Sequence, residues 1–308
     1  MESGMEFFKR LLLRDSFGTT SSHSDASRQQ VGATAYAVAA FRAAESAAPS
    51  PLVTDAVAKA VFALRGPAPL LWRITTAALS WRSVLRRIFC FRRWTKFDVL
   101  IDMMACRTRH LDEQLTAAGA PLQAVIIGAG LDARSIRLHQ HGRYWFEVDF
   151  AAMHNAKWEL FASAGFAQPE NLECVSADLT ERGAWQRALL AARGFDRSVP
   201  TLWLLEGLTS YLEQDELHHL LEQIIDLSAA GSVVLATFIA ATRPEGSAAS
   251  PLAMHKFFTD APEALFDAFA MNGMVETSTI GQLASRYDRP SINSNDSGYR
   301  FVRAVKGK

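Results

Sequence analysis

The chain has 308 residues, 49% of them hydrophobic, and its 32 basic and 32 acidic side chains give a formal charge of zero. This length and apolar content predict a sizeable core, in one large domain with an attached cap or in two modest domains. Because no net field attracts polyanions, the composition predicts no nucleic-acid partner. No apolar run is long enough for stable insertion into a membrane.

The three cysteines, Cys90, Cys106 and Cys174, are odd in number, far apart and without C-x-x-C spacing. This pattern argues against a disulfide framework and against a thiolate metal site, so we expect no metal. In the N-terminal apolar run, Lys9 and Arg10 interrupt the hydrophobic residues that a secretion signal would require. The sequence therefore predicts a protein of the reducing cytoplasm.

The N-terminal part of the chain is expected to precede the main domain. Residues 1–33 predict a mobile segment, because the stretch before Thr34 is polar and rich in Ser and Thr. Residues 34–118 predict a helical N-terminal cap region, whose first helix would have Thr34 as its N-cap. On that helix, Arg42 and Glu45 lie one turn apart and favour an exposed ion pair, with contact to a ligand as the alternative.

The stretch from Trp72 to Trp94 interleaves tryptophans with arginines. Within it, Trp81, Leu85 and Ile88 follow helical spacing and form an apolar stripe. Two interpretations stay open: a cap helix packed over the main domain, which the neutral charge favours, or a helix on a membrane surface or an acidic partner. A further helix is expected from residue 98 to 115, just before the central strand.

The sequence of residues 123–137, QAVIIGAGLDARSIR, predicts a buried strand, a glycine turn and a helix. This helix is expected to begin at Asp132 and to end before Gly142. Gly128 and Gly130 have no Cβ, so a ligand can approach the backbone at the carboxyl end of the strand. A G-A-G in isolation is equally typical of any tight turn between a strand and a helix. This motif alone therefore does not decide between a ligand-binding turn and a purely structural one.

Downstream of the glycine turn, strands and helices alternate. The expected strands are 144–148, 172–176, 201–205 and 232–238, with helical patterns between and behind them. This alternation predicts an α/β fold with a parallel sheet covered on both faces. We expect residues 119–308 to form this domain, with a substrate-cap insertion around residues 240–270.

Three acidic residues, Asp149, Asp178 and Glu206, each come directly after an expected strand. A single acid at such a place is typical of a helix cap. In an open parallel sheet, however, the carboxyl ends of the strands converge on the ligand crevice beside the glycine turn. Three acids in succession therefore favour a ligand. The spacing from Gly130 to Glu147 or Asp149 suits a carboxylate that accepts hydrogen bonds from ribose hydroxyls.

Two kinds of ligand fit this arrangement. Residues 128–133 satisfy G-x-G-x-x-A, so a dinucleotide, and with it an NAD(P)-dependent oxidoreductase, remains an alternative. Against it, Asp132 places a negative charge at the helix start, where a pyrophosphate would bind. Acids at several strand ends suit a ligand that carries a cation and no phosphate, as S-adenosyl-L-methionine does.

Six motifs occur in order: TAYAVAAFRAAES, ACRTRHLD, VIIGAGLDAR, FEVDF, SADL and LLEGLTSYL. In these motifs the chain resembles the class I S-adenosylmethionine-dependent methyltransferases of the leucine carboxyl methyltransferase type, which include bacterial O-methyltransferases. The resemblance runs from about residue 34 to residue 305. It implies a Rossmann-like, seven-stranded, mostly parallel sheet with helices on both faces and a terminal antiparallel strand, for which 274–280 and 299–305 are candidates.

The resemblance also implies how the donor S-adenosyl-L-methionine binds. Its methionine part would lie against Gly128 and Gly130, its ribose on Asp149, its adenine between Asp178 and Leu179, and its amino-acid end near Glu206 and Arg107. The implied reaction is O-methylation of a hydroxyl or carboxyl group on a small molecule, such as a secondary metabolite. A non-catalytic protein that only binds the donor is the other alternative.

The acceptor side carries the differences from the family pattern. Ala133 stands where the family usually has threonine, and Asp55-Ala56 stands where it usually has Asp-Pro. The sequence consequently identifies neither the acceptor nor an oligomeric state. It also assigns no catalytic base, since His218, His219 and His255 are not distinguished by their patterns.

Overall fold

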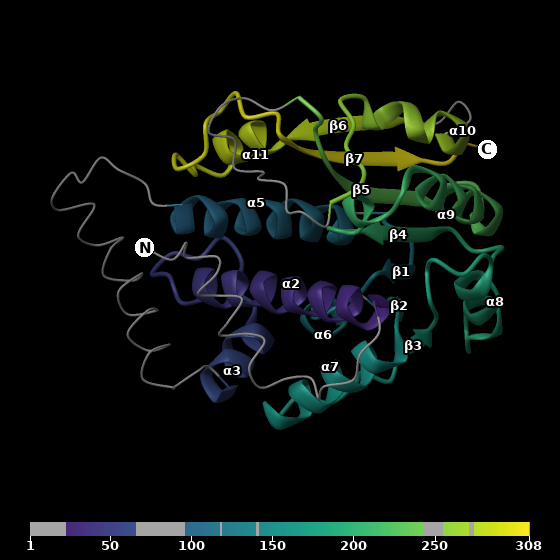
Figure 1. Ribbon diagram of the computed structural model, residues 1–308, viewed down its shortest axis with the longest axis horizontal. Helices are drawn as coiled ribbons and strands as arrows, with labels where there is room; N and C mark the ends of the chain where they lie inside the picture. Colours follow the sequence, from purple (N-terminus) through teal and green to yellow (C-terminus); the bar gives the residue numbers. More distant parts are fainter. Residues whose placement is uncertain are drawn as a thin grey trace, which may run out of the picture. The chain divides into compact units, whose positions relative to one another are not determined.

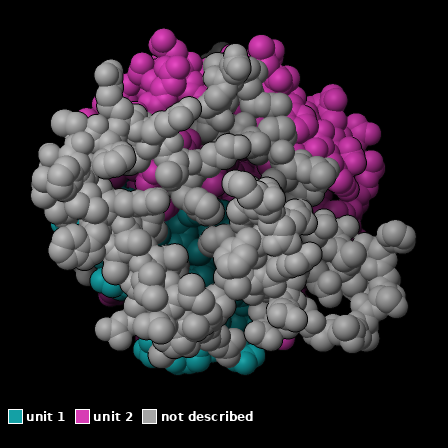
Figure 2. Space-filling model, turned by 60° about the vertical axis from the view of Figure 1, so that its left-hand side comes forward, with its two compact units in different colours: residues 1–93, 130–133, 156–167 teal, residues 94–129, 134–155, 168–308 magenta. Residues whose placement is uncertain are grey.

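The computed structural model describes residues 23–65, 96–117, 119–139, 142–242, 255–270 and 274–307. The Trp/Arg-rich stretch from residue 72 to 94 and most of the N-terminal segment lie outside these ranges. The chain divides into two compact units, coloured separately in Figure 2. Unit 1 comprises residues 1–93, 130–133 and 156–167, and unit 2 comprises residues 94–129, 134–155 and 168–308.

Unit 1 contains two helices, α2 (His23–Ser46) and α3 (Ala56–Arg65). The expected helix start at Thr34 is wrong, because α2 already begins at His23. No proline interrupts residues 23–33 of the sequence. Polarity alone therefore misplaced the beginning of this helix.

The predicted exposed pair of Arg42 and Glu45 is also wrong. Arg42 instead donates to Asp55, with 2.9 Å between Nε and Oδ2, and to the carbonyl of Leu131 at 2.8 Å. Glu45 is buried and accepts a hydrogen bond from the amide of Leu52 at 2.6 Å. Both side chains thus connect α2 to other segments of unit 1.

Unit 2 contains a seven-stranded sheet with the order β3-β2-β1-β4-β5-β7-β6 (Figure 1). The strands are β1 (Gln123–Ile127), β2 (Tyr144–Asp149), β3 (Leu172–Ser176), β4 (Thr201–Leu205), β5 (Val233–Ile239), β6 (Val275–Thr279) and β7 (Tyr299–Val305). The first five strands are mutually parallel, whereas β7 runs antiparallel to both β5 and β6. The predicted Rossmann-like, mostly parallel α/β fold is confirmed.

Strand β1 lies in the middle of this sheet, and all five of its residues are buried. Successive side chains of a strand point to opposite faces. On one face, Val125 and Ile127 join the core formed with Trp203 of β4 and Trp185 of α8 (Ala184–Ala191). On the other face of the sheet, His110 of α5 (Lys96–Thr116) contacts Phe301 of β7, with 5.3 Å between the ring centroids.

The helix expected from residue 98 to 115 is present as α5, which begins two residues earlier and ends one residue later. The compact units, however, do not follow the boundary that we expect at residue 118. Helix α5 belongs to unit 2, with the sheet. Within that unit, Arg107 of α5 bonds to Glu206, which follows β4. The helix after the glycine turn, α6 (Arg134–Arg137), is a single turn and therefore much shorter than the pattern suggests.

The remaining helices of the described chain are α7 (Ala151–Ser163), η2 (Thr209–Tyr211), α9 (Gln214–Leu227), η3 (Pro262–Phe266), α10 (Asp267–Ala270) and α11 (Ile280–Arg286). Helix α9 begins with a capping box between Glu213 and Glu216, and it buries Leu217, Leu220 and Ile224 against the sheet core. Within the described ranges, no helix has both the length and the apolar character needed to span a membrane.

Candidate functional site

The strand order determines which predicted site residues meet. In the run β3-β2-β1-β4, four predicted residues lie at the carboxyl ends of neighbouring parallel strands. Asp149 is the last residue of β2, and Asp178, Gly128 and Glu206 follow β3, β1 and β4. Backbone hydrogen bonds join these ends, from Ala177 to the carbonyl of Asp149 at 3.0 Å and from Gly128 to the carbonyl of β2 residue 148 at 2.9 Å. Residues from separate parts of the sequence are thereby collected at one edge of the sheet.

The two predicted glycines both adopt left-handed backbone conformations, with φ of 70° at Gly128 and 46° at Gly130. A Cβ at Gly128 would lie 3.2 Å from Cδ1 of Leu208, two residues after Glu206. A Cβ at Gly130 would lie 3.2 Å from Cβ of Ala35 on α2. Conformation and close packing therefore both require glycine at these positions.

Local hydrogen bonds orient the aspartate that ends β2 and the aspartate that follows β3. Asp149 is only 9% exposed, and its Oδ1 accepts a hydrogen bond from the amide of Phe150 at 2.8 Å. Asp178 Oδ1 accepts from the amide of Thr180 at 2.9 Å and from its hydroxyl at 2.6 Å. Each carboxylate is thus held in a defined direction at the sheet edge before any ligand binds.

Arg107 and Glu206 form a direct ion pair, with 2.6 Å between Nε and Oε1. Arg107 Nη1 also donates to the hydroxyl of Tyr299, the first residue of β7, at 3.2 Å. Burial by itself lowers the pKa of Arg107, but its contacts with Tyr299 and Glu206 outweigh this effect and raise the pKa above its usual range. The guanidinium is therefore permanently charged and fixed in position.

Several further residues of this network were not predicted as site residues. Arg134, only 2% exposed, binds the second carboxylate oxygen of Glu206 through Nη1 and binds Asp112 through Nε at 2.6 Å. Asp112 also accepts from Arg137 at 2.8 Å. A cation in the first turn of a helix is electrostatically unfavourable, so Arg134 in the LDAR motif was itself a sign that carboxylate partners lie nearby. Tyr299 had no such local signal.

The loop after β4 is anchored to the neighbouring strand by one threonine. The Thr237 hydroxyl on β5 accepts a hydrogen bond from the amide of Gly207 at 2.8 Å. The Thr237 carbonyl accepts another from the hydroxyl of Thr209 at 2.6 Å. Because both bonds lie directly after Glu206, they fix the position of the network's central carboxylate.

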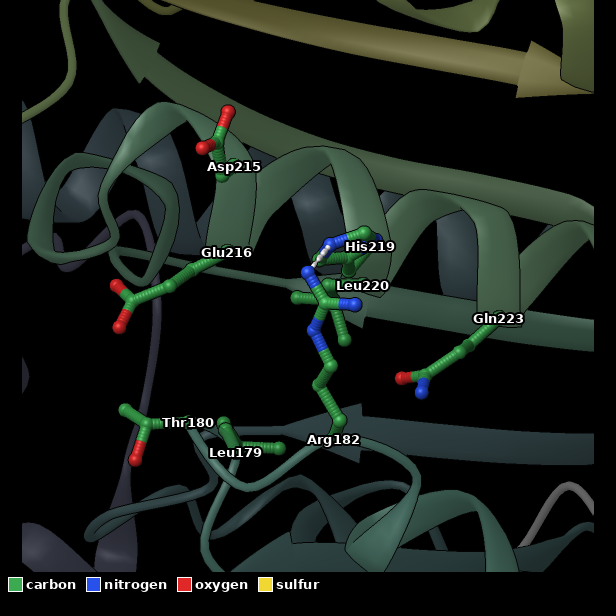
Figure 3. Close-up of a pocket in the computed structure, with 8 residues that line it drawn as sticks. All are labelled: Leu179, Thr180, Arg182, Asp215, Glu216, His219, Leu220 and Gln223. Atoms are coloured by element: carbon green, nitrogen blue, oxygen red, sulfur yellow. Dashed lines mark hydrogen bonds between the residues drawn. The ribbon is translucent and has the colours of Figure 1, made fainter.

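Leu179 packs partly against the sheet core and lines a cavity of about 120 Å³ between the loop after β3 and helix α9. Figure 3 shows Arg182 extending from this loop to His219 of α9, whose ring nitrogen it contacts. The carboxylates of Asp215 and Glu216, also on α9, project away from this contact. The cavity therefore adjoins the site edge at Leu179 but contains none of the acids that end β2 and β4.

One group of side chains has the chemistry of a metal site. Ligand atoms of Glu147, His154 and Cys174 lie within 4.8 Å of one another. Ser135 donates a hydrogen bond to Glu147 at 3.0 Å, and the His154 ring contacts the carbonyl of Val175 at 3.3 Å. These contacts belong to the packing among α6, β2, α7 and β3, so we assign no metal to the group.

A doubly wound sheet with acids and a glycine turn at its carboxyl edge defines the class of Rossmann-like proteins that bind a nucleoside-containing ligand. The sequence model of the family "Leucine carboxyl methyltransferase" matches residues 35–225 of this chain. The chain belongs to the leucine carboxyl methyltransferase family. S-adenosyl-L-methionine, predicted from the sequence, is the cofactor of this class of enzyme.

Relatives have names that agree with this family. A Mycobacterium tuberculosis protein named "Putative S-adenosyl-L-methionine-dependent methyltransferase" is 38% identical over 213 residues, which cover 67% of this chain and 64% of the relative. A Mycobacterium marinum protein of the same name is 38% identical over 216 residues, covering 65% of this chain and 63% of that protein. The match thus spans less than two thirds of these relatives.

Among solved structures, an O-methyltransferase family protein from Burkholderia thailandensis is similar to this chain with a TM-score of 0.46 and 14% identity. The superposition covers 75% of this chain and 70% of that one. This likeness is too distant to bear on the reaction or on the site.

Proposed function

We propose that the protein transfers the methyl group of S-adenosyl-L-methionine to an oxygen, hydroxyl or carboxyl, of a small-molecule acceptor. The observation that carries the proposal is the strand order β3-β2-β1-β4, which gathers Asp178, Asp149, Gly128 and Glu206 at one edge. A nucleoside with a positively charged sulfonium fits an edge made of carboxylates and bare backbone. Family membership supports the same donor.

We assign the following roles to the chain's residues. Asp149, already oriented by the amide of Phe150, accepts hydrogen bonds from the ribose hydroxyls. Asp178 and Leu179 contact the adenine, and the backbone at Gly128 and Gly130 lies against the methionine part. Arg107 holds the donor's carboxylate, while Glu206 and Tyr299 orient its guanidinium.

S-adenosyl-L-methionine supplies a methyl group on a sulfonium, which is activated for in-line displacement. The protein then has little covalent chemistry to perform, and its main contribution is to align the acceptor oxygen with that carbon. Such alignment lowers the barrier by up to about 7–11 kcal/mol. The buried ion pair of Arg107 and Glu206 favours this alignment, because a rigid anchor for the donor's amino-acid end also fixes the direction of its methyl group.

The test is calorimetric titration with S-adenosyl-L-methionine and, separately, with NAD. We expect donor binding in the intact protein and its loss in Asp149→Ala, since charge-assisted hydrogen bonds contribute about 1.5–3 kcal/mol each. The matched control is Asp226→Ala, which changes an exposed aspartate on α9 and should leave affinity unchanged. Unaltered affinity in Asp149→Ala would contradict the ribose assignment.

Two alternatives give different results in the same experiments. An NAD(P)-dependent oxidoreductase would bind the dinucleotide and not the methyl donor. A non-catalytic binder would bind the donor yet yield no labelled product when labelled donor is incubated with cell extract. Labelled product, identified by mass spectrometry, would decide for a methyltransferase and reveal its acceptor.

The proposal includes expectations about partners and location. From the balanced charge we propose a small-molecule acceptor and no nucleic-acid partner. From the absence of long apolar runs in the sequence we propose no stable membrane insertion. The cysteine pattern continues to favour the cytoplasm, where Cys106 and Cys174 would stay reduced.

A further inference from the structure

Three aromatic side chains lie together near the carboxyl ends of β4 and β5. One comes from η2, which follows Glu206 in the chain, and two come from residues 255–258, which follow β5. The rings of Tyr211 and His255 meet edge to face, with 5.0 Å between centroids and 76° between planes. The rings of His255 and Phe258 also meet edge to face, with 6.3 Å between their centroids and 68° between their planes. All three side chains are partly exposed. We call Tyr211, His255 and Phe258 the aromatic cluster.

Backbone hydrogen bonds fix the segment that carries His255. The carbonyl of Ser210 accepts from the amides of Lys256 at 2.7 Å and of Phe257 at 3.3 Å. The amide of Thr259 donates to the carbonyl of Ile239, the last residue of β5, at 3.1 Å. The aromatic cluster is therefore anchored at the carboxyl ends of β4 and β5 rather than on an independent loop.

The position of the aromatic cluster relative to the donor site follows from the sheet. The order continues from β4 to β5, so the cluster lies at the same edge as Asp149 and Glu206 but on the opposite side of Glu206 from Asp149. If the donor binds as proposed above, its amino-acid end and sulfonium lie near Arg107 and Glu206. The next group along the edge is then the aromatic cluster, in the place where an acceptor would stand.

We propose that the aromatic cluster binds a planar aromatic acceptor that carries a hydroxyl group, and that His255 accepts the proton of this hydroxyl. Aromatic rings at offset or edge-to-face geometry recognise another ring by packing. A carboxylate acceptor would need no base, whereas a hydroxyl does, and an imidazole suits this task near neutral pH. The inference rests on the proposed function and specifies its acceptor class.

Methyl transfer to the hydroxyl oxygen is a displacement at carbon, with His255 as the proton acceptor. The acceptor oxygen forms a bond to the methyl carbon, the carbon–sulfur bond breaks, and its electron pair remains on sulfur. The hydroxyl proton moves to a ring nitrogen of His255 and later to solvent. Among the residues that the structure describes, the titratable groups near His255 include the phenol of Tyr211 and, beside the cluster, the ion pair of Lys256 with Glu213, whose atoms are 3.2 Å apart.

The first test uses 4-nitrophenol, whose absorption reports whether its hydroxyl is ionised. We expect it to bind the donor-loaded protein as the phenolate, and His255→Gln to abolish this spectral change. His255→Phe, which keeps a ring against Tyr211, should restore binding without ionisation. His218→Gln, an exposed histidine on α9, is the matched control and should behave like the unaltered protein. Binding only in the protonated form, or an unchanged spectrum in His255→Gln, would overturn the proposal.

The second test follows methyl transfer from labelled donor to a panel of phenols and of matching benzoates. We expect transfer to phenols, a loss of about 10²–10⁴-fold in kcat for His255→Gln, and removal of the acidic limb of the pH–rate profile. Transfer to benzoates alone, or to no phenol at all, would refute the acceptor class. Calorimetry with S-adenosyl-L-methionine on the same variants separates the two possible failures. If only the acceptor class is wrong, the protein still binds the donor; if the proposed function is wrong, it does not.

Discussion

Helix α5 carries two ionic networks that differ in their surroundings. The inner network consists of Arg107, Asp112, Arg134 and Glu206, and the side chains of Arg107 and Glu206 are each 8% exposed. The outer network consists of Arg109, Glu113, Arg286 and Tyr287, and the side chains of Arg286 and Glu113 are 57% and 26% exposed. The two networks use the same types of charged group, yet water reaches one of them far more easily.

This difference in solvent exposure indicates which network can position a ligand. Exposed ion pairs are screened and contribute about 0–1 kcal/mol, so the outer network can rearrange at little cost. In the inner network, removal of one partner leaves a buried charge unpaired, which costs about 3–5 kcal/mol. The inner network is therefore rigid, and rigidity is the property that the donor's amino-acid end requires.

Among the substitutions that distinguish the two networks, Glu206→Leu should have the largest effect. It leaves both Arg107 and Arg134 without their shared carboxylate, so we expect the free energy of unfolding to fall by about 3–5 kcal/mol. Urea denaturation measures this change. The control is Glu222→Leu, an exposed position on α9, where we expect less than about 1 kcal/mol. Equal effects of the two variants would show that the inner network has no special role.

A milder change is Arg134→Lys, which keeps the charge but cannot bridge Asp112 and Glu206 with a planar fork. We expect a loss of about 1–3 kcal/mol in the free energy of unfolding, together with weaker donor binding by calorimetry. The matched substitution Arg109→Lys in the outer network should change neither quantity. A donor affinity equal to that of the unaltered protein would remove Arg134 from the positioning network.

His110, beside the outer network, makes the comparison depend on pH. Burial lowers its pKa below the usual 6.5, and Arg286 lowers it further, while Glu113 acts in the opposite direction. The unfolded chain consequently binds a proton first, so the contribution of His110 to stability is complete above pH 6.5 and is lost as the pH falls below it. We expect His110→Phe to flatten the decline in stability as the pH falls below about 6.5, as followed by urea denaturation. A decline identical to that of the unaltered protein would contradict this assignment.

The smallest effect should come from Arg286→Ala in the outer network. Its ion pair with Glu113, at 2.9 Å, should contribute about 0.2–1 kcal/mol at neutral pH and less at high salt. Burial raises the pKa of Glu113, but Arg109, Tyr287 and Arg286 together lower it overall. This stabilisation is lost as the pH falls through the lowered pKa, so the variant should differ least from the unaltered protein in strong acid. A salt-independent loss of several kcal/mol would contradict the comparison.

Much of the fold followed from local patterns. The strands at residues 172–176 and 201–205 were predicted with the ends that the structure gives them, because short, mainly apolar runs before turn residues mark strands. The strand at residues 299–305 also has the expected ends, but it was implied by the resemblance to the family and not by its own pattern. The start of α2 was not predicted, because a polar helix and a polar loop have similar composition. The extent of α6 was not predicted either, since nothing in the sequence showed that its second turn would be absent.

The candidate site divides in the same way. The acids after the strands were identified because their position relative to each strand is visible in the sequence, and the sheet order brings them together. Arg134 and Tyr299 were missed because their role depends on partners far away in the sequence. Arg42 shows the same limit, since its partner Asp55 lies on another segment, whereas Glu45 was only its nearest acid.

Tyr299 opens the last strand of the sheet, 192 positions after its partner Arg107. Strand β7 pairs with β5 along its whole length and separates β5 from β6. A contact of such sequence separation forms late, because the closure entropy of a long loop must be overcome first. During synthesis, then, the parallel half of the sheet can assemble before the arginine acquires its phenolic partner, so complete order at the ligand edge would coincide with the final step of folding.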